Sequence, residues 1–190
     1  LQYSIPDKAV CFAFVGKLEA KKRPLDFIAA LRDAKAGDCG ICGLIVGSGE
    51  LLDDAKAFAL EHRLPVTFAG FLNQSEIAKA YVAADALVLP SDFGETWGLV
   101  VNEAMACGTP AVVSDAVGCG PDLVEPGVTG EVTPLDDVPA LATGIDRVLG
   151  FDPVAVRRHL AERIMVYSPE RAAEGILEAG AALAGLTRLR

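Results

Sequence analysis

Two carboxylates stand eight positions apart in the segment between Pro90 and Pro110, with Glu95 just ahead of a predicted helix and Glu103 inside it. On one continuous helix these side chains would be separated by ~12 Å along the axis and by about 80° around it. That separation is too large for both carboxylates to bind one atom or one metal ion. It suits two parts of an extended ligand. The spacing therefore predicts an elongated polar molecule lying along the N-terminal end of a helix.

A local basic cluster is the second feature that could bind a ligand. Lys17, Lys21, Lys22 and Arg23 place four cations within seven residues, opposed only by Glu19. The cluster directly follows a predicted strand, and parallel α/β sheets bind ligands at the carboxyl ends of their strands. Lysines supply point charges for phosphate. The cluster is therefore interpreted as an anion site, with a solvated loop as the alternative.

Glycines mark further loops at the same predicted edge, in Gly47-Ser48-Gly49 and in Gly118-Cys119-Gly120. Glycine lets a backbone approach an anion closely, and helix N-termini add oriented N–H donors. Carboxylates in such places bind hydroxyl groups. Groups that donate hydrogen bonds to phosphate, together with two separated carboxylates, indicate a site for a nucleotide that carries a second polyol. Under the alternative, the glycines only form turns and the glutamates are solvated surface charges.

The elements that must position these residues alternate between short apolar runs and helical patterns, which is typical of a parallel α/β sheet. The apolar runs are continuous, as expected for strands that are covered on both faces. This pattern predicts a doubly wound, Rossmann-like parallel sheet of about six strands. The predicted strands are Val10–Val15, Gly43–Val46, Val66–Phe68, Ala86–Leu89, Ala111–Ser114 and Gly130–Val132.

Helices are expected between these strands, at about 25–36, 50–62, 75–84, 98–107 and 137–149. No further strand is predicted after residue 150, where Asp152-Pro153 and Ser168-Pro169 each begin a helix. The chain is therefore interpreted as a single domain over residues 1–190. Its α/β core covers about 1–150, and a helical tail covers 151–190.

Composition excludes several classes of protein. The net charge of −9 argues against nucleic acid and anionic membranes as general partners. No apolar run approaches the roughly 18 residues of a membrane span, and no signal peptide is recognisable. The chain begins at Leu1 without an initiator Met, so we interpret it as a piece of a longer protein.

The five cysteines form an odd set without secretory context, which favours a reduced, cytoplasmic location. Cys39 and Cys42 form a CxxC motif, but it leads into a strand, and the chain has no second pair for a structural zinc. His62 and His159 are the only histidines and are expected on the surface. Buried or incidental thiols are therefore favoured over a metal or redox site, and no cofactor is predicted.

A dinucleotide cofactor is the main competing ligand. The segment Gly47–Leu52 begins like the dinucleotide fingerprint but lacks its third glycine, and no acid follows the next strand at Val66–Gly70. The sequence contains no Walker A motif, and no Ser-His-Asp triad can be recognised in it. These absences favour a nucleotide that is neither NAD nor the substrate of a P-loop enzyme.

Six short motifs occur in order along nearly the whole chain, and together they resemble the C-terminal, donor-binding domain of a retaining group 1 glycosyltransferase of the GT-B fold. The last but one is the family's Glu-x7-Glu motif. The motifs are Phe14-Val15-Gly16-Lys17-Leu18 with Lys22, Val46-Gly47-Ser48-Gly49, Phe68-Ala69-Gly70-Phe71, Ala84 through Ser91, Glu95 through Gly108, and Val117-Gly118 through Gly127 and Gly130.

The resemblance implies roles for these residues. Lys17 and Lys22 would bind the donor diphosphate and stabilise the leaving group without a metal ion. Glu95 would hold the donor sugar, and Glu103 would take the ribose hydroxyls. The implied catalytic residues are Lys17, Lys22 and Glu95. The implied donor-binding residues are Gly16, Lys17, Lys22, Gly47, Ser48, Gly49, Phe71, Leu72, Glu95, Thr96, Trp97, Gly98, Leu99 and Glu103.

The chain departs from the family pattern at two positions. Lys17 stands where the family more often has arginine, and Arg23-Pro24 replaces a common glycine, so the following helix is expected to start differently. The lobe that binds the acceptor has no counterpart here. The isolated domain is therefore expected to bind a nucleotide sugar and to transfer little sugar alone.

In such folds the final helix, here from about residue 168, packs toward the other lobe, so its Ala and Leu face is expected to be exposed and to favour a homodimer. Two other functions stay open, a non-catalytic nucleotide-binding module and one lobe of a nucleotide-sugar epimerase. In the full-length protein a peripheral place at the inner face of the membrane also stays open. The base, the sugar and the acceptor are not determined by the sequence.

Overall fold

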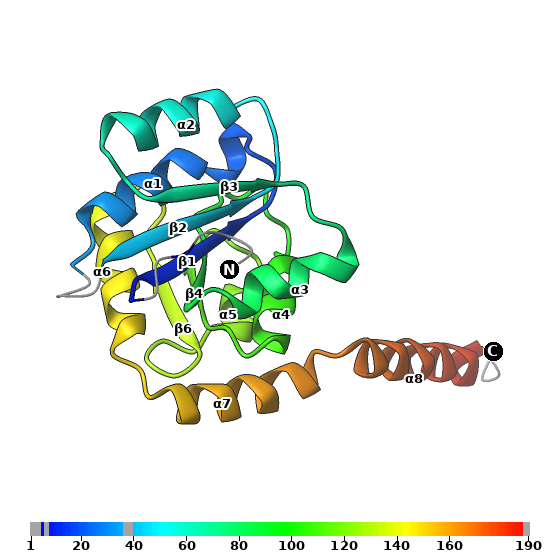
Figure 1. The fold of residues 1–190 in the computed structure, drawn as a ribbon. Helices are drawn as coiled ribbons and strands as arrows, with labels where there is room; N and C mark the ends of the chain where they lie inside the picture. The colour runs from blue at the N-terminus through cyan, green and yellow to red at the C-terminus, as the bar shows by residue number, and fades with distance from the viewer. Residues whose placement is uncertain (1–4, 6–7, 36–39, 188–190) are drawn as a thin grey trace.

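The computed structural model describes residue 5 and residues 8–35 and 40–187. Its centre is a parallel sheet of six strands in the order β3-β2-β1-β4-β5-β6 (Figure 1). The order reverses between β1 and β4, so the predicted doubly wound, Rossmann-like fold is confirmed. The strands are β1 (Val10–Val15), β2 (Ile41–Val46), β3 (Val66–Gly70), β4 (Ala86–Leu89), β5 (Ala111–Ser114) and β6 (Gly130–Thr133).

Both faces of the sheet are covered, which explains the continuous apolar strands. Successive residues of β1 alternate between two cores. Cys11 and Ala13 belong to the core that also holds buried residues of α3 and α4, whereas Phe12 and Phe14 belong to the core shared with α1 and α6. The sheet thus forms the middle layer of three.

The bounds of the helices between the strands differ from the predicted bounds by at most three residues. They are α1 (Pro24–Asp33), α2 (Leu52–Glu61), α3 (Gln74–Val82), α4 (Leu99–Ala106) and α6 (Val138–Leu149). Two short elements were not predicted, the 3₁₀ turn η1 (Ala20–Lys22) and α5 (Gly120–Leu123), because a single turn leaves no periodicity in a sequence. Arg23, at the position of the family's common glycine, takes a left-handed conformation, and α1 begins directly after it at Pro24.

The last two helices differ in their packing. α7 (Pro153–Val166) packs against α4 and buries Val156 and Leu160. α8 (Pro169–Thr187) extends away from the sheet (Figure 1), and its Ile176, Leu177 and Leu183 are exposed. The expected exposed apolar face is therefore present on this helix in the single chain. Within the described residues, none of the helices combines the length and apolar character that a membrane crossing requires.

Cys11 and Cys42 lie near the amino ends of β1 and β2, whereas Cys119 lies in the loop after β5, where its thiol donates to the carbonyl of Gly98 at 3.9 Å. Cys39 of the CxxC motif lies outside the described residues, and Cys42 of β2 is the register partner of Cys11 on β1. Both are buried, and the hydrogen bond to Cys42 together with burial raises the pKa of the Cys11 thiol. In the part of the chain that the structure describes, no three His, Cys, Asp or Glu side chains lie close enough to hold one metal ion.

Candidate functional site

The loops with predicted chemistry gather at the carboxyl edge of the sheet, beside the point where the strand order reverses between β1 and β4. A cavity of about 650 Å³ opens there between the loops after β1, β2 and β3 and the helices α3 and α4. Eight residues of the predicted donor-binding set line it. These are Gly16, Lys17, Gly47, Ser48, Gly49, Phe71, Leu72 and Glu103, joined by Val15, Val46, Ile77 and Val100.

The glycines of the β2 loop have a packing role that the sequence alone did not reveal. Gly47 has a φ of 133°, and a Cβ there would lie 1.9 Å from the carbonyl oxygen of Gly16. A Cβ on Gly49 would lie 2.4 Å from the carbonyl oxygen of Leu18. The two loops therefore touch backbone to backbone, and this contact forms one wall of the cavity.

Lys22 and Glu95, predicted as catalytic residues from distant parts of the sequence, form an ion pair. Their side chains are only 16% and 14% exposed. The alkyl chain of Lys22 passes over Gly16, where a Cβ would lie 3.9 Å from Lys22 Cδ and Cε. This contact places the ion pair next to the cavity. Burial lowers the pKa of the Lys22 amine, nearby Lys21 lowers it further, and Glu19 acts in the opposite direction.

Asp92 shapes the loop that carries Glu95, and sequence analysis assigned it no role. Its backbone N–H donates to the carbonyl of Lys21 at 2.9 Å, which ties the β4 loop to η1. Its side chain accepts from the N–H of Gly94 at 2.8 Å, and its carbonyl accepts from the N–H of Glu95 at 3.0 Å. An aspartate two residues before a glycine is a signature of this kind of turn, so the signal was present.

Glu103 lies on α4 at the wall of the cavity, and Tyr81 of α3 positions it. The hydroxyl of Tyr81 donates to Glu103 Oε2 at 2.6 Å. Tyr81 is buried, and burial and this hydrogen bond raise the pKa of its hydroxyl, which therefore remains a donor. Glu103 itself is exposed and open to a ligand. A tyrosine in a helical pattern is indistinguishable from a core residue in sequence, so this partner could not be predicted.

The remaining predicted residues do not all face the same cavity. Glu95 precedes α4 by four residues, so the distance expected for two carboxylates on one continuous helix does not apply. Trp97 points elsewhere. Its indole N–H donates to Asn102 Oδ1 at 2.7 Å, and its ring lies 6.1 Å from that of Tyr167. Trp97 and Leu99 line a second cavity of about 560 Å³ beside the junction of α7 and α8.

Thr96 and Gly98 shape the start of α4. A Cβ on Gly118 would lie 2.0 Å from the carbonyl oxygen of Thr96, so the β5 loop packs directly on this segment. Gly98 is the N-cap of α4 and has a φ of 100°, a conformation that favours glycine. Lys17 is exposed at the cavity and makes no ion pair with any residue that the structure describes.

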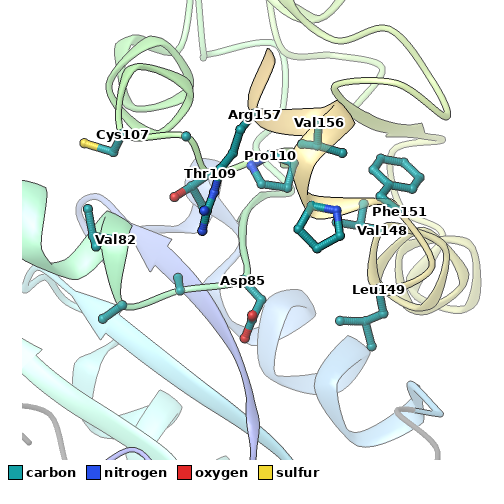
Figure 2. Close-up of a pocket in the computed structure, with 14 residues that line it drawn as sticks. Val82, Asp85, Cys107, Thr109, Pro110, Val148, Leu149, Phe151, Val156 and Arg157 are labelled. Carbon is teal, nitrogen blue, oxygen red and sulfur yellow. The ribbon is translucent and has the colours of Figure 1, made fainter. Parts of the chain in front are cut away.

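A third cavity, of about 430 Å³, lies at the amino ends of β4 and β5, opposite their carboxyl ends (Figure 2). Asp85 and Arg157 are its charged lining residues. Asp85 is used structurally, because its Oδ2 accepts from the N–H of Cys11 at 2.8 Å and its own N–H donates to the Cys11 carbonyl at 2.7 Å. These bonds join β1 to the start of β4, so Asp85 has a structural role in the sheet.

Comparisons with known proteins identify the family of this chain. Residues 2–164 match the family described as "Glycosyl transferases group 1". A D-inositol 3-phosphate glycosyltransferase from Mycobacterium sp. (strain KMS) is 36% identical over 159 residues, which are 82% of this chain and 36% of that protein. A glycogen synthase from Mycobacterium tuberculosis is 38% identical over 152 residues, or 79% of this chain and 36% of that protein. The chain thus spans about a third of these relatives.

A solved structure shows the same relation. The sucrose-phosphate synthase of Thermosynechococcus elongatus superposes with a TM-score of 0.79 at 29% sequence identity. The match covers 100% of this chain and 48% of that protein. The chain therefore corresponds in fold to about half of that protein.

The contact between the β1 and β2 loops predicts the effect of one added methyl group. Gly47→Ala is expected to lower the free energy of unfolding by about 2–3 kcal/mol, because the new Cβ would overlap a backbone oxygen at a positive φ. Gly40→Ala is the control, since a Cβ there meets nothing within 4 Å, and it should stay within about 0.5 kcal/mol of the parent. Urea unfolding measures both, and equal values would contradict the packing role of Gly47.

Proposed function

The chain belongs to the group 1 glycosyltransferase family, and from this premise we propose that it is the donor-binding half of a retaining enzyme. That enzyme would transfer a sugar from a nucleoside diphosphate to an acceptor. The observation that carries the proposal is the partly buried ion pair of Lys22 and Glu95 beside a cavity that Glu103 lines. A cation and two separated carboxylates thus adjoin one cavity, as a donor with a diphosphate, a sugar and a ribose requires.

The cavity has the size of a ligand site. Its volume of about 650 Å³ falls within the usual range of roughly 300–1,000 Å³ for small-molecule pockets. We place the nucleoside between Phe71, Leu72 and the β2 loop, with its ribose on Glu103. The carboxylate of Glu103 can accept hydrogen bonds from the ribose hydroxyls while its Oε2 also accepts from the hydroxyl of Tyr81.

The diphosphate lies, in this proposal, between Lys17, Lys22 and the N-terminus of α4, where backbone N–H groups favour an anion. Glu95 then accepts hydrogen bonds from the donor sugar. When the sugar–phosphate bond breaks, negative charge develops on the leaving diphosphate, and the ammonium groups stabilise it electrostatically. The low exposure of Lys22 strengthens that interaction, because little water screens it. No metal ion or other cofactor is required for this step.

The acceptor is bound, in this proposal, by a second lobe outside the 190 residues. The curated relatives are about three times as long as the matched segment, which leaves room for such a lobe. Because donor and acceptor must meet between the lobes, these 190 residues alone are expected to bind donor and to transfer little sugar. We also propose a cytoplasmic location, on the ground that the chain has an odd number of cysteines and no secretory context.

The first prediction concerns nucleotide binding. One of UDP, GDP and ADP, at 100 times its Kd, should add ~2.7 kcal/mol to the stability of the folded protein. For a domain of this size the Tm should rise by roughly 5–10 °C. Glu103→Ala should abolish the shift, whereas Glu61→Ala, on the exposed end of α2, should keep it. A shift with NAD alone would overturn the proposal.

The second prediction separates catalysis from binding. In the enzyme with both lobes, Lys22→Ala should lower kcat by about 10²–10³, because the leaving group loses its charge stabilisation. Donor affinity should fall less. Lys56→Ala, an exposed lysine of α2, is the matched control and should change neither value. Equal losses in rate and affinity would instead indicate a pure binding role for Lys22.

The third prediction is a pH dependence. The pKa of Lys22 is lowered from the ordinary 10.5, mainly by burial. As the pH rises through this lowered pKa the amine loses its charge, so kcat/KM for the donor should fall at a pH below 10.5. Lys22→Arg keeps its charge at high pH and should move this fall upward. An unchanged profile in that variant would mean that another group titrates.

A further inference from the structure

Two strained residues meet beside the proposed catalytic lysine. Among the described residues, three that are not glycine have a left-handed backbone, namely Arg23 (φ 54°), Arg63 (φ 54°) and Asp136 (φ 62°). Side chains with a Cβ adopt this conformation rarely, and it persists where the surroundings enforce it. Arg23 and Asp136, which are 113 positions apart in the sequence, form an ion pair with each other.

Arg23 connects three parts of the molecule. It directly follows Lys22, ends η1 through a hydrogen bond from its N–H to the carbonyl of Ala20 at 3.1 Å, and precedes the first residue of α1. Its Nε donates to Asp26 Oδ2 on α1 at 2.6 Å. Its Nη2 binds Asp136 in the loop between β6 and α6. One guanidinium therefore holds the turn of Lys22 against two other elements.

We propose that Arg23 is a positioning residue for the transfer reaction, which keeps the amine of Lys22 on Glu95 and at the donor diphosphate. This inference rests on the proposed function, since it takes Lys22 as the residue that binds phosphate. The backbone of residue 23 is left-handed, and Asp26 and Asp136 hold its side chain. When these contacts are lost, the turn relaxes toward commoner conformations and the Lys22 amine moves away from the donor.

The exposures of the three side chains separate this role from a purely structural one. The side chain of Asp136 is 67% exposed, whereas those of Arg23 and Asp26 are 26% and 27% exposed. Ion pairs with an exposed partner contribute little to stability. Loss of the Asp136 carboxylate should therefore hardly change the Tm. A misplaced catalytic group, by contrast, can cost about 10²-fold in rate.

The experiment uses the full enzyme and compares two arginines that share a φ of 54°. Arg23→Ala should lower kcat by about 10- to 100-fold with a smaller change in the KM for donor. Arg63→Ala changes an arginine with the same φ of 54° beyond the end of α2, and should leave kcat unchanged. Arg23→Lys should recover most of the rate, because an ammonium can still bind one carboxylate.

A second variant tests the partner. Asp136→Asn should lower kcat at an unchanged Tm. The double variant that also carries Arg23→Ala should be no slower than Arg23→Ala alone, because both substitutions remove the same ion pair. If Arg23→Ala does not fold, Asp136→Asn decides the question, since its site is exposed.

The outcomes are distinguishable from a failure of the proposed function. If Lys22→Ala is inactive while Arg23→Ala and Asp136→Asn both match Arg63→Ala, the positioning role is wrong and the proposed function stands. If Lys22→Ala is fully active, the proposed function fails, whatever the Arg23 variants show. Additive losses in the double variant would show that Arg23 and Asp136 act separately and would overturn the paired contact.

Discussion

The reversal of strand order between β1 and β4 is the constraint on which the rest of this structure depends. From β1 the chain adds β2 and β3 in one direction along the sheet. It then returns to place β4 on the other side of β1 and adds β5 and β6 in the opposite direction. Because the connections run in opposite directions from this point, the loops after β1 and β4 separate and leave a crevice. Lys22 and Glu95 lie on these two loops, and their ion pair spans the crevice.

Close backbone contacts fix the loops at this crevice relative to one another. Gly47 allows the β2 loop to rest on the β1 loop, and Gly118 allows the β5 loop to rest on the segment before α4. Asp92 joins the β4 loop to η1 through a backbone hydrogen bond. These contacts hold groups from four loops in fixed relation. A site built in this way can bind its ligand with little reorganisation, which favours both affinity and electrostatic catalysis.

The charge of the site is local and differs from that of the whole chain. The protein carries a net charge of −9, yet the loop after β1 gathers Lys17, Lys21, Lys22 and Arg23. Three of these four cations form ion pairs: Lys22 with Glu95 at low exposure, Arg23 with Asp26 and the exposed Asp136, and Lys21 with Glu19. Lys17 is exposed and available to a ligand. The positive charge of this loop is therefore partly neutralised by carboxylates and partly open to solvent at Lys17.

The sequence by itself determined the fold class and the approximate strands, because continuous apolar runs are local patterns. It also predicted a site at the carboxyl edge of the sheet with Lys22, Glu95 and Glu103. Only the tertiary structure showed that Lys22 and Glu95 are paired, that Tyr81 positions Glu103, and that Trp97 faces the α7–α8 junction. It also showed that Arg23 meets Asp136. These relations join residues that are 22 to 113 positions apart, and they arise from packing across elements, which no local pattern in a sequence encodes.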